Sequence, residues 1–188
     1  MVTIVYSHPY DKSFNNEILN QVSRELAANG RSYRVINLYQ ENFDPVLGME
    51  DYSIYPEGKT TDEEVKEYQK ILEDTNHLIF IFPIWWGMMP AILKGFIDKT
   101  FLKGTIYDTT PDGVMMPCLD IERTTVITTS QQDTAIIAPF MEGYFFPQVF
   151  NTVGINNVDW HNCPKTLSST PARRAEFIAE VLASLTDE

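Results

Sequence analysis

Short runs of β-branched and aromatic residues alternate along the chain with longer segments in which apolar residues recur every three or four positions. The short runs predict strands and the longer segments predict amphipathic helices. The run His77–Phe82 (HLIFIF) is the most hydrophobic and indicates a central strand, whereas the more polar run Tyr33–Leu38 is typical of a sheet edge. The five predicted strands are Val2–Ser7, Tyr33–Leu38, His77–Phe82, Thr124–Thr128 and Gly154–Trp160.

Residues with known preferences for helix ends mark the helices between these strands. Ser13 is a suitable N-cap for the first helix, and Gly30 suits its end. Pro90 opens a later helix at a favoured first position. A further helix is expected over Ala135–Asn151, which two prolines and a glycine interrupt, and Pro171–Leu185 has the apolar stripe of a last helix.

The segment between the second strand and the second helix has two distinct parts. Gln40–Lys59 contains two prolines and two glycines and predicts a long loop. Thr61 and Glu64 then have the spacing of a capping box, in which each side chain accepts from the other residue's backbone N–H. The sequence therefore places the start of the second helix at Thr61.

Five strands that alternate with five helices predict an α/β fold with a doubly wound parallel sheet and helices on both faces. Two strand orders compete, the Rossmann type and the flavodoxin type 2-1-3-4-5. In both, ligands bind beyond the carboxyl ends of the strands. In the flavodoxin order, the loops after the first, third and fourth strands line one crevice: Ser7–Asn15, Pro83–Pro90 and Thr129–Thr134.

Composition narrows the class of protein. The 188 residues, 44% of them hydrophobic and 12% aromatic, suit one folded domain over residues 1–188 and exclude a disordered chain. The net charge of −12 argues against a nucleic-acid partner. No apolar run is long enough for a transmembrane segment, and no signal peptide is evident. The two cysteines, Cys118 and Cys163, indicate neither a disulfide scaffold nor a metal site, so we expect a soluble cytoplasmic protein without a metal.

The loop after the first strand reads SHPYDKSFN and matches neither G-x-G-x-x-G nor a P-loop. It ends at a helix N-terminus, where the Ser13 hydroxyl and the N–H groups of Phe14 and Asn15 could bind a phosphate. Taken alone, Ser13 is more simply a plain N-cap, and His8 is more simply a packed loop residue.

The loops after the third and fourth strands suit a flat ligand. The first of them, FPIWWGMMP, places Trp85 and Trp86 at a strand end, where aromatic rings can form the wall of a pocket. Because consecutive residues of an extended segment point to opposite faces, we expect one indole to be structural and the other to face the pocket. The second loop, TTSQQD, is polar and could donate hydrogen bonds to a ligand or form an ordinary turn.

Three segments together resemble the NAD(P)H:quinone oxidoreductase family, the DT-diaphorase-like proteins of flavodoxin-2 type. They are HPYDKSFN, FPIWW followed by PAILKGFIDKTF, and ITTS. The resemblance implies a flavodoxin-like fold, a homodimer and bound FAD or FMN. The activity that we expect from it is reduction of quinones or similar aromatic acceptors by two-electron ping-pong hydride transfer, with NAD(P)H as transient co-substrate. The residues that it places around the flavin are His8, Ser13, Phe14, Asn15, Pro83, Ile84, Trp85, Trp86, Thr128, Thr129 and Ser130.

The chain departs from the family pattern at positions that face the substrate. Ser130-Gln131-Gln132 stands where members commonly have a Gly-Gly pair, and Tyr144 is the only candidate for a tyrosine farther along that loop. FAD is slightly favoured over FMN: SFN resembles the FAD-binding members, whereas the short chain resembles small FMN-binding ones. An excess of aromatic residues also predicts a dimer interface. These residues are Tyr52, Tyr55, Phe140, Tyr144, Phe145, Phe146 and Phe150.

Two other functions remain open at this point. The acidic surface suits a flavodoxin-like electron carrier that serves protein partners, although SHPYDKSFN lacks the Ser/Thr- and Gly-rich phosphate loop of flavodoxins. The third possible function is that of a flavoprotein regulatory subunit of a membrane transporter.

Overall fold

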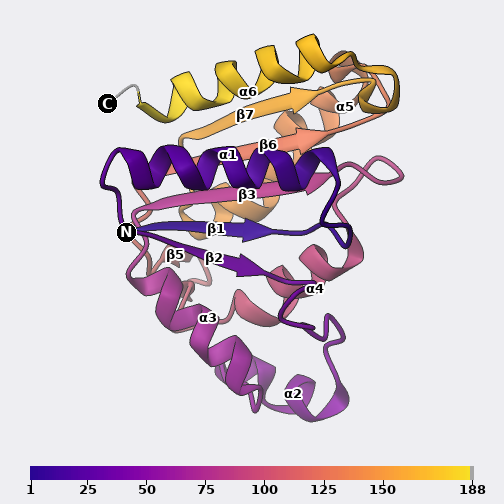
Figure 1. Ribbon diagram of the computed structural model, residues 1–188. Helices are drawn as coiled ribbons and strands as arrows, with labels where there is room; N and C mark the ends of the chain where they lie inside the picture. Colours follow the sequence, from indigo (N-terminus) through magenta and orange to yellow (C-terminus); the bar gives the residue numbers. More distant parts are fainter. Residues whose placement is uncertain (187–188) are drawn as a thin grey trace.

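A computed structural model, which describes residues 1–186, has a five-stranded parallel sheet at its centre (Figure 1). Its order is β2-β1-β3-β6-β7. Counted along the chain, the parallel strands therefore have the order 2-1-3-4-5, and the flavodoxin-like prediction is confirmed. The strands are β1 (Val2–Tyr6), β2 (Tyr33–Asn37), β3 (His77–Pro83), β6 (Arg123–Thr129) and β7 (Val158–Cys163). Residues 187 and 188, the end of the expected domain, lie outside the described residues.

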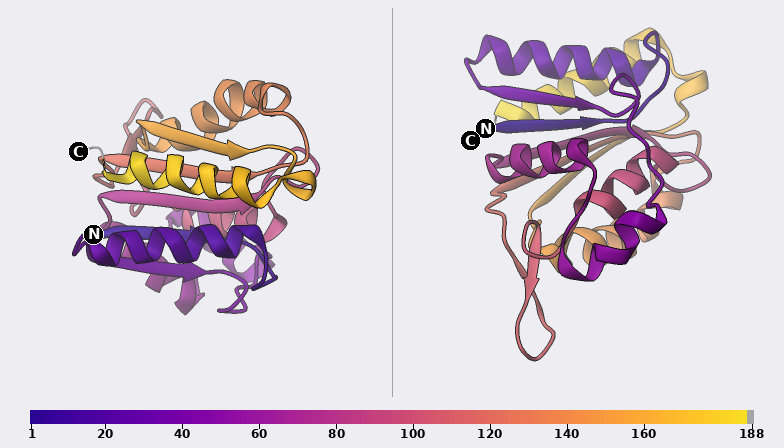
Figure 2. Two further views of the ribbon diagram at one scale, coloured as in Figure 1. Left: turned by 45° about the horizontal axis from the view of Figure 1, so that its top comes forward. Right: turned by 90° about the horizontal axis from the view of Figure 1, so that it is seen from below.

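Helices cover both faces of the sheet, as Figure 2 shows. On one face, α1 (Phe14–Ala28) and α6 (Pro171–Thr186) pack their apolar stripes on β1, β3 and β6. The other face carries α3 (Glu63–Glu73), α4 (Ala91–Thr100), α5 (Thr134–Phe140) and a π-helix, Met141–Phe150. Alternation along β1 explains the two cores, because Ile4 and Tyr6 pack toward α1 while Val5 packs toward the opposite layer.

The predicted long loop contains helical structure that the sequence did not indicate. Short helices form at α2 (Met49–Ile54) and at the 3₁₀ turn Tyr55–Glu57. The capping box is also wrong, because Asp62 is the N-cap of α3 and its carboxylate accepts from the N–H groups of Glu64 and Val65. The Thr61 hydroxyl instead donates to Asp51 Oδ1 at 2.9 Å. Because the Thr61 hydroxyl is engaged by Asp51 of α2, the adjacent Asp62 carboxylate, a stronger acceptor, caps the helix instead.

The segment Ala135–Asn151 is not one regular helix. It runs as α5, the π-helix and a 3₁₀ turn, Asn151–Val153. Pro139 and Pro147 have no N–H to donate, so the chain cannot keep regular α-helical hydrogen bonding through them. As a result β7 begins at Val158 rather than at the predicted Gly154, which adopts a left-handed conformation with φ +80°.

A small antiparallel hairpin was not predicted at all. Its strands are β4 (Tyr107–Thr109) and β5 (Met115–Pro117), and it projects beyond the body of the molecule (Figure 2). A last 3₁₀ turn, Thr166–Ser168, leads into α6. Such short strands lie below the length at which alternation can be read from a sequence.

Three of the aromatic residues that suggested an interface belong to the core of the single chain. Phe145, Phe146 and Phe150 are at most 6% exposed, and Phe150 stacks on Phe80 with ring centroids 5.1 Å apart. The excess of aromatic residues is therefore smaller than the sequence suggested, while Tyr52 and Tyr144 remain exposed. Within residues 1–186, no helix combines the length and the apolar character that crossing a membrane requires.

Candidate functional site

The carboxyl ends of β1, β3 and β6 bring the three loops together, and two adjoining cavities open between them. One has a volume of about 410 Å³ and lies against the loop after β1. The other, about 710 Å³, lies between the tryptophan loop and the loop after β6. The residues that line both cavities are Ile84, Trp85, Ser130 and Gln131. The site is thus at the edge where this class of sheet binds its ligands.

The N-terminus of α1 forms one wall of the smaller cavity. Ser13 is the N-cap, and its hydroxyl oxygen accepts from the backbone N–H of Asn16 at 3.1 Å. The N–H groups of Phe14 and Asn15 precede the first intrahelical hydrogen bond and stay available to a ligand. This end of the helix can therefore bind an anion through backbone donors and the helix dipole.

Asn15 connects the loops after β1 and β6. Its side chain is 3% exposed, and Nδ2 donates to Thr129 Oγ1 at 2.8 Å. Its other polar atom, Oδ1, has no hydrogen-bond partner within residues 1–186. A buried carbonyl oxygen without a donor beside a cavity is suited to accept a hydrogen bond from a bound molecule.

The tryptophan loop is a tight two-residue turn. Hydrogen bonds join Trp85 N–H to the Met88 oxygen at 2.8 Å and Met88 N–H to the Trp85 oxygen at 3.0 Å. Trp86 and Gly87 between them have φ of +52° and +80°, which is the pattern of a type I′ turn. The N–H of Ile84, just before the turn, donates to the oxygen of Thr129 at 2.7 Å and so extends the sheet.

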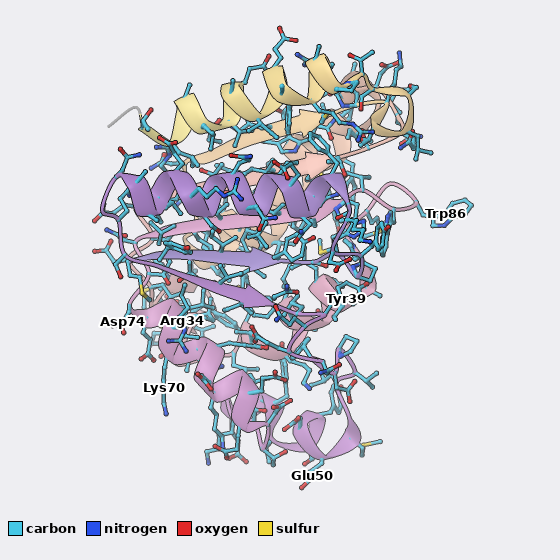
Figure 3. The ribbon with its side chains drawn as sticks, in the orientation of Figure 1. Arg34, Tyr39, Glu50, Lys70, Asp74 and Trp86 are labelled. Carbon is cyan, nitrogen blue, oxygen red and sulfur yellow. The ribbon has the colours of Figure 1, made fainter. Side chains whose placement is uncertain are left out.

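The two indoles do not divide into a structural and a pocket-facing residue. Trp85 is 40% exposed, and Trp86 is fully exposed and points away from the body of the molecule (Figure 3). The expectation that one of them lies in the core is wrong, because the extended strand ends before Trp85 and the chain reverses at Trp86. Both residues line the larger cavity.

His8 lies against the Trp85 indole. The two rings meet edge to face, with centroids 5.9 Å apart. His8 Nδ1 accepts from the Tyr10 N–H at 3.1 Å, so the neutral ring carries its proton on Nε2. Burial lowers the pKa of His8, which favours this neutral form.

The loop after β6 is held by a side chain that sequence reasoning missed. Asn162 on β7 donates from Nδ2 to Ser130 Oγ at 3.2 Å and to Thr134 Oγ1 at 2.8 Å. Thr128 is fully buried and lines neither cavity; its hydroxyl donates to Asn162 Oδ1 at 2.9 Å and accepts from the Trp160 ring N–H. Thr128 therefore positions the residues that face the cavities.

Arg174 on α6 is a second residue that the sequence analysis missed. Its guanidinium lies 5.2 Å from the centre of the Phe14 ring, donates from Nη2 to the Thr166 oxygen at 2.9 Å, and lines the smaller cavity. One signal for it was present: Arg173 and Arg174 both lie in the first turn of a helix, where the dipole disfavours cations. Arg173 pairs with Glu176 and Glu180 of the same helix, whereas Arg174 has no ion pair within residues 1–186.

The structure brings all the predicted site residues except Thr128 to the walls of these two cavities. The predicted residues on the walls are His8, Ser13, Phe14, Asn15, Pro83, Ile84, Trp85, Trp86, Thr129 and Ser130. The additional wall residues include Tyr10, Gln131, Gln132, Leu167 and Arg174.

Comparison with known proteins agrees with this architecture. The flavodoxin-2 family, described as having a flavodoxin-like fold, matches residues 1–187. A solved structure of an NAD(P)H:quinone oxidoreductase from Methanothermobacter marburgensis superimposes with a TM-score of 0.89 at 25% identity, covering 99% of this chain and 97% of that one. An FMN-dependent NADH-azoreductase from Bacillus anthracis, solved with FMN, gives 0.77 at 16% identity over 99% of both chains, which shows a shared fold.

Curated relatives match over a shorter region. Ribosyldihydronicotinamide dehydrogenase [quinone] of Rattus norvegicus is 31% identical over 124 residues, which cover 57% of this chain and 53% of that protein. An uncharacterized NAD(P)H oxidoreductase of Escherichia coli is 30% identical over 62% of this chain and 58% of its own length. The chain thus spans about half the length of the curated relatives that it matches. It belongs to the flavodoxin-2 family of flavodoxin-like proteins, within which it is similar to NAD(P)H:quinone oxidoreductases.

Proposed function

We propose that this protein is a flavin-dependent NAD(P)H oxidoreductase that reduces quinones or similar small aromatic acceptors. The observation that carries the proposal is the pair of adjoining cavities, which run from a helix N-terminus suited to phosphate to an aromatic wall at Trp85. The family membership and the similarity to the quinone oxidoreductase of Methanothermobacter marburgensis support it.

The residues present fit a flavin. Ser13 and the N–H groups of Phe14 and Asn15 would hold its phosphate, and the unpartnered Asn15 Oδ1 would accept from a hydroxyl group of its ribityl chain. The ring system would lie against Ile84–Trp85 and the Thr129–Ser130 segment, which the hydrogen bond from the Ile84 N–H to the Thr129 oxygen joins. A bound flavin supplies hydride transfer from NAD(P)H to the acceptor.

The chain's own residues bind and orient the reactants. The Trp85 face offers a surface for a flat acceptor, and the neutral His8 ring can donate a hydrogen bond from Nε2. Gln131 and Gln132 replace the family's paired glycines on the wall of the larger cavity, so their amide groups would meet the polar substituents of the acceptor. The volume of about 710 Å³ beside the ring site favours an enzyme over an electron carrier, which needs no substrate cavity.

We propose FAD rather than FMN as the flavin on the basis of one further cavity, whereas the similarity in fold to the FMN-dependent azoreductase favours FMN. A further cavity of about 330 Å³ adjoins the phosphate site through Ser13, Phe14 and Arg174, and Lys12 also lines it. Lys12 and Arg174 suit the pyrophosphate that FAD has and FMN lacks, although the carboxylate of Glu17 also lines this cavity. Mass spectrometry of the cofactor released on denaturation tests this assignment, and Arg174→Ala should weaken FAD binding more than FMN binding.

A homodimer is part of the proposal. Val46, Met49 and Tyr52 are all more than 60% exposed and follow one another at helical spacing, and Trp86 and Met88 add apolar surface at the turn. A second copy that covers these side chains would also enclose the larger cavity, which the tryptophan turn borders.

One experiment tests the central claim. The purified protein should be yellow, or should bind added flavin with quenching of flavin fluorescence, and should then oxidise NADH or NADPH only when a benzoquinone is present. A protein that takes up no flavin on reconstitution would overturn the proposal. Flavin binding without quinone turnover would favour the electron-carrier function instead.

A further inference from the structure

A separate polar cavity of about 360 Å³ lies above the carboxyl ends of β1 and β2. Tyr39, which follows β2, marks its position at the same edge of the sheet as the tryptophan turn (Figure 3). His8 is the one residue that it shares with the smaller cavity of the flavin site, and it shares none with the larger one. Its lining residues are Tyr6, His8, Pro9, Asp11, Asn16, Asn37, Tyr39 and Gln40.

Tyr6 shows that this cavity is built for a polar group. The residue is 1% exposed, on a strand whose neighbouring residues Ile4 and Val5 are buried and aliphatic. The residue lines the cavity; its buried hydroxyl lies beside the Ser13 side chain but completes no hydrogen bond within residues 1–186. Burying a hydroxyl without a partner is costly, so a group that binds there is its natural partner.

The other lining residues present donors and acceptors side by side. His8 carries a proton on Nε2, and Gln40 keeps its amide donors free because its Oε1 accepts from Asn37. On the acceptor side, Asn16 donates to the Asp11 backbone oxygen and so leaves its own Oδ1 free. The Asp11 carboxylate makes no hydrogen bond or ion pair with residues 1–186.

This mixture selects one class of ligand. A phosphate accepts only, and the Asp11 carboxylate would repel it, while neither lysine nor arginine lines the cavity. A metal ion would find a single carboxylate. Neighbouring hydroxyl groups of a sugar each donate and accept, which matches the arrangement.

We propose that this cavity binds the vicinal hydroxyls of a ribose-like sugar, with Tyr6 and Asp11 as its central partners. Two sources share this chemistry. Because His8 also borders the flavin site, the sugar can be the ribose of the nicotinamide reductant; alternatively it belongs to a separate nucleoside. The sugar site does not depend on the flavin assignment.

The test uses methyl β-D-ribofuranoside, a ribose without a base or a phosphate, and its 2-deoxy analogue as probes in ligand-observed NMR. The ribofuranoside should bind the wild-type protein and the deoxy analogue should bind about fivefold more weakly, as expected for one lost hydrogen bond. Tyr6→Phe should weaken ribofuranoside binding about fivefold, and Asp11→Asn about tenfold, because Asp11 is a charged acceptor.

Matched controls lie far from the cavity. Tyr33→Phe at the start of β2 and Asp112→Asn in the projecting hairpin should leave probe binding unchanged. Since Tyr6→Phe removes only an unpartnered hydroxyl, its melting temperature should not fall. Flavin content is measured on the same samples, which separates failure of this site from failure of the flavin proposal.

Competition identifies the source of the sugar. Displacement of the probe by nicotinamide riboside from the flavin-loaded protein supports the reductant, whereas displacement by adenosine but not by nicotinamide riboside supports a separate nucleoside. The proposal is overturned if the ribofuranoside does not bind, if Tyr6→Phe and Asp11→Asn bind it like the wild type, or if inorganic phosphate displaces it.

Discussion

At the scale of the residue, buried polar side chains, rather than exposed ones, hold the loops of the site in place. Asn15 joins the start of α1 to the end of β6 through a hydrogen bond of 2.8 Å to Thr129, and Asn162 on β7 holds the loop after β6 through one of 2.8 Å to Thr134. A bridging amide fixes the distance between loops that are far apart in the sequence, and it needs partners that only the folded chain supplies. Substitution of either asparagine should therefore disturb the cavities more than its own small contact area suggests.

Ser13 offers a direct test of the phosphate site. Ser13→Asp keeps an N-cap but adds a negative charge, whereas Ser13→Ala removes the cap. We expect Ser13→Asp to weaken flavin binding more than about tenfold relative to the wild type, because like charges a few ångströms apart repel strongly. Flavin fluorescence titration measures the affinity, and urea unfolding checks that the Asp variant is the more stable of the two. Equal flavin affinity in the two variants would leave Ser13 as a plain cap.

His77 gives the fold a dependence on pH. His77 is 2% exposed, and its Nε2 lies 2.9 Å from Thr125 Oγ1. Burial lowers the pKa of His77 most, the charges of Arg123 and Arg31 lower it further, and the resulting pKa is about 4. Between pH 4 and 6.5 the unfolded chain thus binds a proton that the folded chain does not. The contribution of His77 to the free energy of unfolding should be complete above pH 6.5, and the free energy of unfolding should fall by roughly 3 kcal/mol as the pH approaches 4.

Urea unfolding at several pH values checks the contribution of His77. In His77→Gln, which retains a side chain able to hydrogen bond with Thr125, the decline between pH 6.5 and 4 should be smaller than in the wild type. Asp51 and Asp62, whose pKa values are lowered by hydrogen bonds and by Lys99, lose their contribution only at lower pH. Identical curves for both proteins would assign the decline to other groups.

At the scale of the element, the tryptophan turn places a large side chain where the backbone favours Gly or Asn. Trp86 has φ +52° and is fully exposed, so neither burial nor backbone preference explains its presence. An unfavourable residue at the border of the larger cavity is typical of a position selected for contact with a ligand or a second subunit.

Trp86→Asn should raise stability and impair function. Asn tolerates the left-handed conformation, so we expect the free energy of unfolding to rise by about 1 kcal/mol. The KM for the quinone should increase, because the indole lines the larger cavity. Thermal unfolding and steady-state kinetics measure the two effects, with Val114→Asn in the exposed hairpin as the control. A lower melting temperature would show that the indole is structural.

At the scale of the whole molecule, the five parallel strands all end on the same side of the sheet (Figure 1), and the residues that line the two cavities of the site gather at that side. The proposed dimer would use a surface beside that edge, at α2 and the tryptophan turn. Light scattering at micromolar concentration should give twice the mass of the chain, which is 21.6 kDa. Met49→Glu should shift the protein toward the monomer, because a carboxylate would have to be buried in the interface. Asn20→Glu, an exposed position on α1, adds the same charge and should leave the dimer intact.

Much of the fold was predictable because its signals are local. The central position of His77–Pro83 follows from its continuous hydrophobic run, and α1 begins where Ser13 caps it. The wrong predictions concern features that contacts between distant parts of the chain decide. Asp62 replaced Thr61 as a cap because Asp51 in α2 occupies the threonine, and Phe145 and Phe150 lie in the core because prolines bend their helix onto β3. Each depends on a contact distant in sequence.

The sequence by itself determined the five parallel strands, the side of the sheet where ligands bind, and most of the residues on that side, because strand pattern and loop position are properties of adjacent residues. Only the tertiary structure decided that Thr128 supports the site from behind, that Arg174 reaches it from the last helix, and that both tryptophans are exposed at a turn. These three features depend on contacts between residues that are distant in the sequence. Such contacts form only when the chain has folded and its helices have packed on the sheet.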